Sequence, residues 1–132
     1  MEDGFYFDET VKIYDTDLQG IVHYAGYYRF FTDTLEQFSL KKTGSVMPLE
    51  NEGIWFVVVE SNAKYHNPAH VGDKLIVYMK PEVISSKAVK YNFEIKRGSD
   101  DICEGYITMV AIDKNKWKAV PLPKEFLDKV SA

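Results

Sequence analysis

Cysteine is almost absent from this sequence, because Cys103 is the only one in 132 residues. No intramolecular disulfide can form, and no Cys-x-x-Cys or His-Glu-x-x-His spacing offers a metal cage. The composition therefore fits a reducing compartment and a fold without covalent or metal cross-links.

Long apolar runs and an excess of positive charge are also lacking. No apolar stretch approaches the ~20 residues that span a bilayer, and the start Met1-Glu2-Asp3-Gly4 is acidic, unlike a signal peptide. The formal charge of −4 gives nucleic acid no general attraction. We therefore expect a cytoplasmic protein with no membrane insertion and no nucleic-acid partner.

Apolar and aromatic side chains are abundant, at 45% and 14% of the residues. This composition argues against disorder, and at this length an ordinary fold buries roughly two-thirds of its unfolded surface. We expect a single domain over residues 1–132 with its own core.

The spacing of apolar residues changes within the first third of the chain. Residues 5–14 alternate between apolar and polar, which predicts a half-buried strand. From Tyr24 to Phe38 the apolar residues recur every three or four positions, which predicts a helix. This helix is expected to end near Lys41 and Lys42, with Gly44 as its left-handed cap.

The remainder consists of short alternating segments separated by Pro, Gly, Asn and Asp. These segments predict strands at 54–65, 75–84, 89–96, 102–112 and 117–120, then a short helix at 124–130. Consecutive strands with short turns pair antiparallel and leave one face for the long helix to cover. The predicted class is α+β, a long central helix wrapped by an antiparallel β-sheet. That is the hotdog arrangement, although the pattern alone leaves a cystatin-like fold open.

A motif in the segment 11–27 reads Asp-x-Asp-x-x-Gly-Ile-Val-x-x-x-x-Tyr. It resembles the 4-hydroxybenzoyl-CoA thioesterase family, in particular the YbgC-like acyl-CoA thioesterases. Segments 55–75 and 119–123 are similar to the same family, so the resemblance spans nearly the whole chain. It implies a hotdog thioesterase domain that hydrolyses an acyl-CoA to a free acid and CoA. No cofactor is expected beyond the coenzyme A carried by substrate and product.

By this resemblance Asp17 is the catalytic carboxylate, and the thioester oxygen meets backbone amides at the helix start, including the N–H of Tyr24. Unpaired N–H groups and a partial positive charge at that end suit an oxygen that becomes anionic. Gly20 and Val22 are placed beside the substrate, with Gly20 allowing close backbone approach. Helix capping is the alternative for Asp17, but a cap reaches only two or three residues ahead.

His23 and Asp15 are the other polar candidates in the motif. YbgC-like sequences have Tyr-His where this chain has His23-Tyr24, so the role of that histidine does not transfer by position. His23 is kept as a catalytic candidate because of its ordinary pKa range, with a structural role as the alternative. Asp15 is expected to be structural, as a cap or loop hydrogen-bond acceptor.

Four further residues are expected to take no part in catalysis. Glu36 lies about 18 Å along the helix from its start. His66 and His70 are separated by a proline-containing turn, unlike a metal pair on a helix. Cys103 has no basic neighbour in sequence, so it is expected to be a small packed hydrophobe.

Ligand contacts are predicted at two places. One set matches the strand beside the acyl group in the relatives, although core packing explains it equally well: Trp55, Phe56 and Val58. A second set is proposed for the phosphates of CoA, with a solvated strand face as the alternative: Ser86, Lys87 and Lys90.

Several functions stay open at this point. The leading one is hydrolysis of a short-chain, branched or aromatic acyl-CoA, with Asp17 as nucleophile or as general base on water. The alternatives are a thioesterase acting on acyl carrier protein and a non-catalytic acyl-CoA-binding protein. A hotdog hydratase is disfavoured because no Asp-x-Asn-x-x-His pattern occurs. Because one such sheet leaves edge strands unpaired, we expect a homo-oligomer, a dimer or a tetramer.

Overall fold

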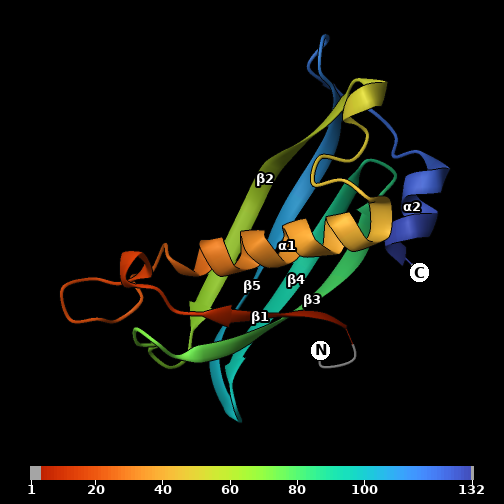
Figure 1. Ribbon diagram of the computed structural model, residues 1–132. Coiled ribbons are helices and arrows are strands. Elements are labelled where there is room, and N and C mark those ends of the chain that lie inside the picture. The colour runs from red at the N-terminus through yellow and green to blue at the C-terminus, as the bar shows by residue number, and fades with distance from the viewer. Residues whose placement is uncertain (1–3, 132) are drawn as a thin grey trace.

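An antiparallel sheet curls around one long helix in the computed structural model, which describes residues 4–131 (Figure 1). The strand order is β1-β3-β4-β5-β2, with β6 paired to β5 off this path. The elements in chain order are β1 Phe5–Thr10, the 3-10 helix η1 Ile13–Asp15, α1 Tyr27–Thr43, the 3-10 helix η2 Glu50–Glu52, β2 Ile54–Tyr65, β3 Lys74–Ser85, β4 Ala88–Arg97, β5 Asp100–Asp113, β6 Lys118–Ala119 and α2 Lys124–Ser131. The predicted α+β class is confirmed.

The helix α1 packs closely against the middle of the sheet. Phe30 and Phe31 have no exposed surface, and the ring of Phe31 stacks on Phe93 of β4 with 4.5 Å between centroids. Gly105 of β5 lies below Phe31, because a Cβ built there would come 3.0 Å from the Phe31 ring and 2.2 Å from the carbonyl oxygen of Asn62. The missing side chain at Gly105 therefore sets how near the helix can lie to the sheet.

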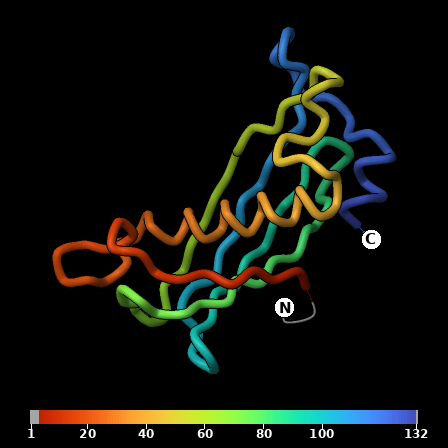
Figure 2. Tube along the Cα trace, viewed as in Figure 1, coloured from red at the N-terminus to blue at the C-terminus, as the bar shows by residue number. Residues whose placement is uncertain are grey.

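The two ends of α1 meet different parts of the chain. At its carboxyl end, Gly44 has φ 80 and donates its N–H to the Leu40 carbonyl, as predicted for the cap. There α1 lies beside α2, and the trace in Figure 2 runs from this end to the loop 45–52 and the start of β2. At its amino end, the loop 11–26 projects beyond the sheet (Figure 2). The candidate catalytic residues are therefore at the surface.

Three sequence predictions about element bounds are wrong. The first strand ends at Thr10 rather than Tyr14, and Ile13 is 81% exposed, because the Asp15 carboxylate accepts the Lys12 N–H and turns the chain into η1. The helix begins at Tyr27, three residues later than predicted, after a turn over 24–26. Trp117 has φ 54 and lies in the turn before β6, not in a strand.

The strand β2 forms a long edge of the sheet. Among the described residues it pairs with β5 on one side, and no strand covers its other side. Val58 and Val59, at its centre, are more than half exposed. A long apolar edge of this kind is a template for pairing with another chain.

The close approach at Gly105 predicts a marked loss of stability in Gly105→Ala. The added methyl group meets a backbone carbonyl that cannot move without disturbing the β2–β5 ladder, so the free energy of unfolding should fall by about 2–3 kcal/mol. Urea denaturation measures this change. Glu104→Ala, at an exposed neighbouring position in the same strand, should change stability by less than about 0.5 kcal/mol. Equal stabilities for the two variants would contradict this close contact at Gly105.

Candidate active site

Asp17 stands at the base of a small hairpin loop. Thr16 and Val22 form an antiparallel bridge, and the Asp17 N–H donates to the Ile21 carbonyl over 2.9 Å. Gly20 completes the turn with φ 76, a conformation that glycine adopts at little cost. No described atom lies within 4 Å of a Cβ built at Gly20. A glycine is therefore favoured at this position because of its backbone angle and not because of crowding.

The two carboxylate oxygens of Asp17 have different surroundings. Oδ1 accepts the N–H groups of Gln19 at 2.9 Å and of Ile21 at 3.3 Å, which fixes the side chain to its own loop. Within residues 4–131 no donor is found for Oδ2, and the residue is exposed. Asp17 does not cap α1, whose N-cap is Gly26 without a side-chain hydrogen bond. One oxygen is thus anchored while the other faces solvent.

Backbone N–H groups without acceptors lie just before α1. The turn over 24–26 is closed by the Gly26 N–H, which donates to the His23 carbonyl at 2.8 Å. No acceptor among the described residues is found for the N–H of Tyr24 or of Ala25. The Tyr24 carbonyl accepts the Tyr65 hydroxyl at 2.8 Å, which attaches this turn to the end of β2. Unpaired donors at a helix start suit an anionic oxygen.

The other motif residues surround this turn. The ring of His23 is exposed and lies edge-on to the Tyr24 ring, with 6.5 Å between centroids. Val22 is 5% exposed and belongs to the core, yet it also lines a shallow hollow of about 320 Å³ beside Tyr24 and Tyr65. The hairpin therefore brings Asp17, His23 and the Tyr24 N–H to one end of α1.

A cluster of four charged side chains holds this loop to the helix. The Arg29 guanidinium, in the first turns of α1, makes two parallel bonds to Asp15, Nε to Oδ1 and Nη2 to Oδ2, each 2.6 Å long. Its Nη1 also binds Glu9 at 2.8 Å and Asp33 at 2.7 Å. Asp15 is 2% exposed and is the only fully buried carboxylate among the described residues. Arg29 is not among the residues predicted from the sequence, where its i,i+4 spacing from Asp33 is the one local signal for this cluster.

The charges of this cluster do not balance, because one guanidinium faces three carboxylates. The pKa of Glu9 is raised to about 7, chiefly by burial; Arg29 opposes this shift, and the neighbouring Asp33 and Asp15 charges add to it. The pKa of Arg29 is raised, chiefly by its hydrogen bonds to Asp15. The Arg29–Asp15 salt bridge is therefore the strongest interaction of the cluster, and Glu9 is the carboxylate that is protonated near neutral pH.

The predicted acyl-contact residues lie on two faces of the sheet. Phe56 and Val58 pair with Ala111 and Met109 on the face toward α1, whereas the Trp55 ring packs edge-on against Trp117 with 6.1 Å between centroids. Adjacent residues in a strand point to opposite faces, so the Trp55 and Phe56 side chains leave β2 on opposite sides, although both residues border the apolar cavity at the start of this strand.

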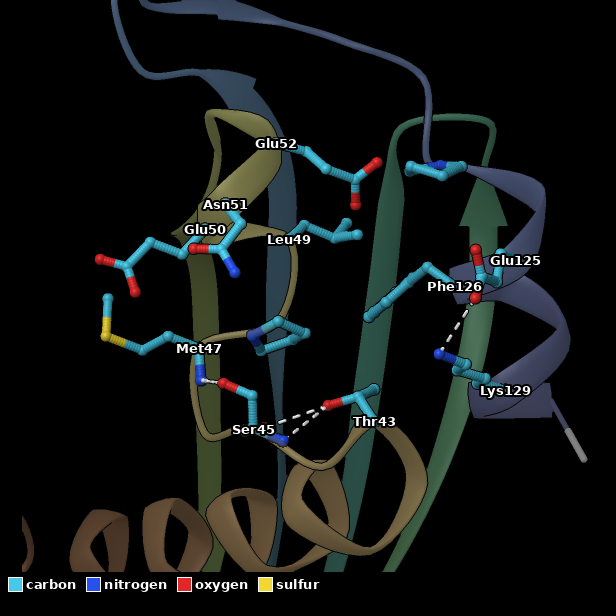
Figure 3. Close-up of a pocket in the computed structure, with 12 residues that line it drawn as sticks. Thr43, Ser45, Met47, Leu49, Glu50, Asn51, Glu52, Glu125, Phe126 and Lys129 are labelled. Carbon is cyan, nitrogen blue, oxygen red and sulfur yellow. Dashed lines mark hydrogen bonds and ion pairs between the residues drawn. The ribbon is translucent and has the colours of Figure 1, made fainter.

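An apolar cavity of about 450 Å³ opens between the second half of α1, the loop 45–50, the start of β2 and α2. Its apolar lining comes mainly from Leu35, Phe38, Val46, Met47, Ile54, Phe56, Met109, Phe126 and Val130. A smaller, more polar hollow of about 280 Å³ adjoins it and shares Met47 and Phe126 (Figure 3). The cavity lies at the end of α1 opposite to Asp17, so one protomer does not bring the two together.

The predicted phosphate contacts are also apart from the loop of Asp17. Ser86 and Lys87 form the β3–β4 turn, where their carbonyls accept N–H groups of Leu122 and Ala111. The Lys90 ammonium lies 4.1 Å from the centre of the Tyr106 ring, and both residues occupy the face of the sheet away from α1. Within one protomer these residues do not join the candidate site.

The remaining titratable residues form no second site. His66 lies 3.5 Å from Glu104 and His70 lies 3.8 Å from Asp73. No group of His, Cys, Asp and Glu that could hold a metal occurs in residues 4–131. Burial raises the pKa of Cys103 to about 12, so its thiol is not a nucleophile at neutral pH. Glu36 is exposed and borders the apolar cavity.

None of the helices in residues 4–131 has the length and apolarity that a membrane crossing requires.

A single antiparallel sheet wrapped around one long helix is the hotdog arrangement predicted from the sequence. The chain matches the thioesterase-like superfamily over residues 11–130 and belongs to it. The predicted family and enzyme class, a thioester hydrolase of hotdog fold, are confirmed at this level.

Relatives with known names fall in the same family. A 1,4-dihydroxy-2-naphthoyl-CoA hydrolase of Synechococcus sp. (strain CC9605) is 31% identical over 121 residues, which cover 86% of this chain and 80% of the relative. The acyl-CoA thioesterase YbgC of Haemophilus influenzae is 26% identical, with 95% and 93% covered. Among solved structures, a 1,4-dihydroxy-2-naphthoyl-CoA thioesterase from Synechocystis superposes with a TM-score of 0.89 at 21% identity, covering 96% of this chain and 95% of that one.

The raised pKa of Glu9 predicts a pH-dependent stability. The folded protein binds the proton of Glu9 more tightly than the unfolded chain, whose carboxyl has the ordinary value of 4.5, so stability is lost as pH rises from 4.5 to about 7. Glu9→Gln stays neutral and lacks this loss. Between pH 5 and pH 8 the variant should therefore gain about 1–3 kcal/mol relative to wild type.

Denaturant unfolding at both pH values measures this gain. Glu125→Gln is the matched control, because Glu125 is exposed and pairs with Lys129 at 3.3 Å. That control should differ from wild type by the same amount at both pH values. A Glu9→Gln difference that is independent of pH would show that Glu9 is ionised throughout this range.

Proposed function

We propose that this protein hydrolyses acyl-CoA thioesters and that Asp17 drives attack on the thioester carbonyl. The observation that carries the proposal is that one end of α1 holds both an Asp17 oxygen without a donor and the N–H groups of Tyr24 and Ala25 without an acceptor among the described residues. The named relatives, which act on 1,4-dihydroxy-2-naphthoyl-CoA and on acyl-CoA, support a CoA thioester. A Staphylococcus aureus protein of the same fold, with a TM-score of 0.87, was solved in complex with CoA.

The chemistry has two routes that use the same groups. In one, the free oxygen of Asp17 attacks the carbonyl carbon, the thiolate of CoA leaves, and water then hydrolyses the mixed anhydride. In the other, Asp17 takes a proton from water as the water attacks, and the proton passes to the leaving sulfur. In both, the carbonyl oxygen becomes anionic and accepts the Tyr24 N–H. His23, exposed beside this turn, is placed to orient water.

The substrate is proposed to bind between two protomers. The strand β2 runs from Ile54, at the apolar cavity, to Tyr65, which binds the Tyr24 carbonyl. If two β2 edges pair antiparallel about a two-fold axis, residue 54 of one protomer comes close to residue 65 of the other. Roughly 36 Å separates the ends of one β2 strand. This pairing therefore brings the apolar cavity of one protomer to the Asp17 loop of the other.

The occupant of this shared site is a short, branched or aromatic acyl group. A cavity of about 450 Å³ lies in the size range of small-molecule sites, and its lining is mostly apolar. The pantetheine arm then follows the surface toward the hollow beside Tyr24 and Val22. The assembly is proposed to be a dimer that associates further into a tetramer in the cytoplasm.

Two other functions use the same fold. An acyl-CoA-binding protein without chemistry needs no free carboxylate at the helix start, so Asp17 favours the enzyme. A thioesterase specific for acyl carrier protein needs contacts with a carrier domain in place of the nucleotide. Thiol release from acyl-CoA and from acyl carrier protein thioesters distinguishes both from an acyl-CoA thioesterase.

Replacement of Asp17 by Asn should lower the rate of hydrolysis by at least ~10²-fold, because the amide can neither attack nor accept the proton. The measurement is thiol release from a panel of acyl-CoA and acyl carrier protein thioesters. Asp101→Asn, an exposed hairpin carboxylate, is the control and should retain wild-type activity. Equal turnover by Asp17→Asn would remove this residue from the mechanism, and binding without turnover by wild type would favour the sensor.

A shared site predicts recovery of activity on mixing two inactive variants, Asp17→Asn and Val58→Trp. After random subunit exchange about half of the dimers are mixed and each has one intact site of two, so about a quarter of wild-type activity should return. Light scattering first establishes that both variants are oligomeric. Asp17→Asn mixed with the double variant is the control and should stay inactive. No recovery despite demonstrated exchange, or monomers at micromolar concentration, would contradict the shared site.

A further inference from the structure

A bidentate salt bridge between Arg29 and Asp15 connects α1 to the loop that carries Asp17. Arg29 is the third residue of α1, and Asp15 is two residues before Asp17. Both oxygens of Asp15 bind the guanidinium at 2.6 Å. A planar guanidinium that donates two parallel bonds fixes both distance and orientation, which an ammonium cannot do.

Asp15 in turn binds the two chain segments that flank the candidate site, one before Asp17 and one before Tyr24. Its Oδ2 accepts the Lys12 N–H at 2.8 Å, and its backbone carbonyl accepts the His23 N–H at 3.2 Å. The same carbonyl lies 2.9 Å from the position of a Cβ at Gly26, so the chain is closely packed there. Asp15 thus holds the arm of the hairpin that leads into Asp17 and also the residue that precedes Tyr24.

The guanidinium itself is held in place by its surroundings. Its central carbon lies 4.6 Å from the centre of the Phe30 ring and 5.4 Å from that of Tyr14. Glu9 and Asp33 bind the remaining Nη1 from β1 and from the next turn of α1. Three elements, β1, η1 and α1, therefore converge on one side chain.

Stability alone is a poor explanation of this cluster. Three carboxylates around one guanidinium leave unbalanced negative charge, and the pKa of Glu9 is raised as a result of burial among them. Buried ion pairs contribute little to folding compared with apolar packing, and their best-supported benefit is a defined geometry. A geometric role fits the position of the cluster next to Asp17.

We propose that Arg29 is a positioning residue for the reaction: through Asp15 it fixes the Asp17 carboxylate relative to the amides at the start of α1. This inference rests on the proposed role of Asp17. Loss of the guanidinium leaves the reacting groups present but displaced. A displacement of about 1 Å can cost on the order of 10² in rate.

The first test is chemical rescue of Arg29→Ala with guanidinium. The variant should lose about 10²-fold in kcat with KM changed less than threefold, since groups that bind CoA remain. Guanidinium ion at about 50 mM should raise the kcat of the variant at least tenfold, and this concentration is far below the molar range that unfolds proteins. The ion can enter because the Arg29 side chain is 27% exposed and its site is open to solvent. Arg29→Lys should stay impaired, because a compact ammonium cannot reproduce the two parallel bonds of the planar guanidinium.

Controls separate this role from general stabilisation. Lys129→Ala removes a distant ion pair and should neither lose kcat nor respond to guanidinium. Asp15→Ala should lose as much kcat as Arg29→Ala, and the double variant should lose no more than either, because both act through one bond. Near-wild-type kcat in Arg29→Ala, or additive losses in the double variant, would overturn the proposal.

A second readout does not depend on activity. Hydrogen exchange of the peptide 16–24 should quicken at least tenfold in Arg29→Ala and slow again with guanidinium, while the middle of α1 keeps its protection. Unchanged exchange in this peptide would refute the positioning role. If wild type cleaves no thioester but the exchange result holds, the proposed function fails and the anchoring of the loop by Arg29 stands.

Discussion

The close approach of α1 to the sheet at Gly105 is the constraint on which the rest of the structure depends. A helix that lies this near to β5 must bury large rings on the facing side, as Phe30 and Phe31 do. The turn over 24–26 that leads into this helix then lies beyond the edge of the sheet, where the N–H groups of Tyr24 and Ala25 meet solvent instead of an acceptor from the described residues. The surface position of the Asp17 loop is thus a consequence of packing in the core, 14 residues away in sequence from Phe31.

Alternation and helical spacing predicted the large elements well, because burial on one face dominates them. The bounds of β2, Ile54–Tyr65, match the prediction at both ends. Prediction failed where a local hydrogen bond competes with the pattern. Residues 11–14 continue the alternation of β1, and Val11 is buried and bonds to Gly72 and Asp73. The bond from the Lys12 N–H to the Asp15 carboxylate then turns residues 12–14 away from the sheet. Apolar spacing also begins at Tyr24, but the turn closed at Gly26 delays the helix.

Only the part of the candidate site that lies in one contiguous sequence motif could be predicted. Asp17, Gly20 and the Tyr24 amide lie within one loop, so their proximity follows from the sequence. Arg29 could not be assigned in this way, because its partners come from β1, η1 and the next turn of α1. The strand alternation did contain one unused signal: neighbours such as Trp55 and Phe56 must face opposite sides. The separation of the apolar cavity from Asp17 depends on tertiary packing, which no local pattern in the sequence encodes.

The burial of Cys103 has a practical consequence for the study of this protein. Its thiol is 1% exposed and its pKa is about 12, so the folded chain offers no thiolate to the aromatic disulfides commonly used to detect free CoA. Colour that develops in such a mixture reports the product and not the protein. When the chain unfolds the same thiol becomes reactive, and the reagent then counts one sulfur for each unfolded molecule. Because of this one buried side chain, the reagent does not react with the native protein and does react with the unfolded protein.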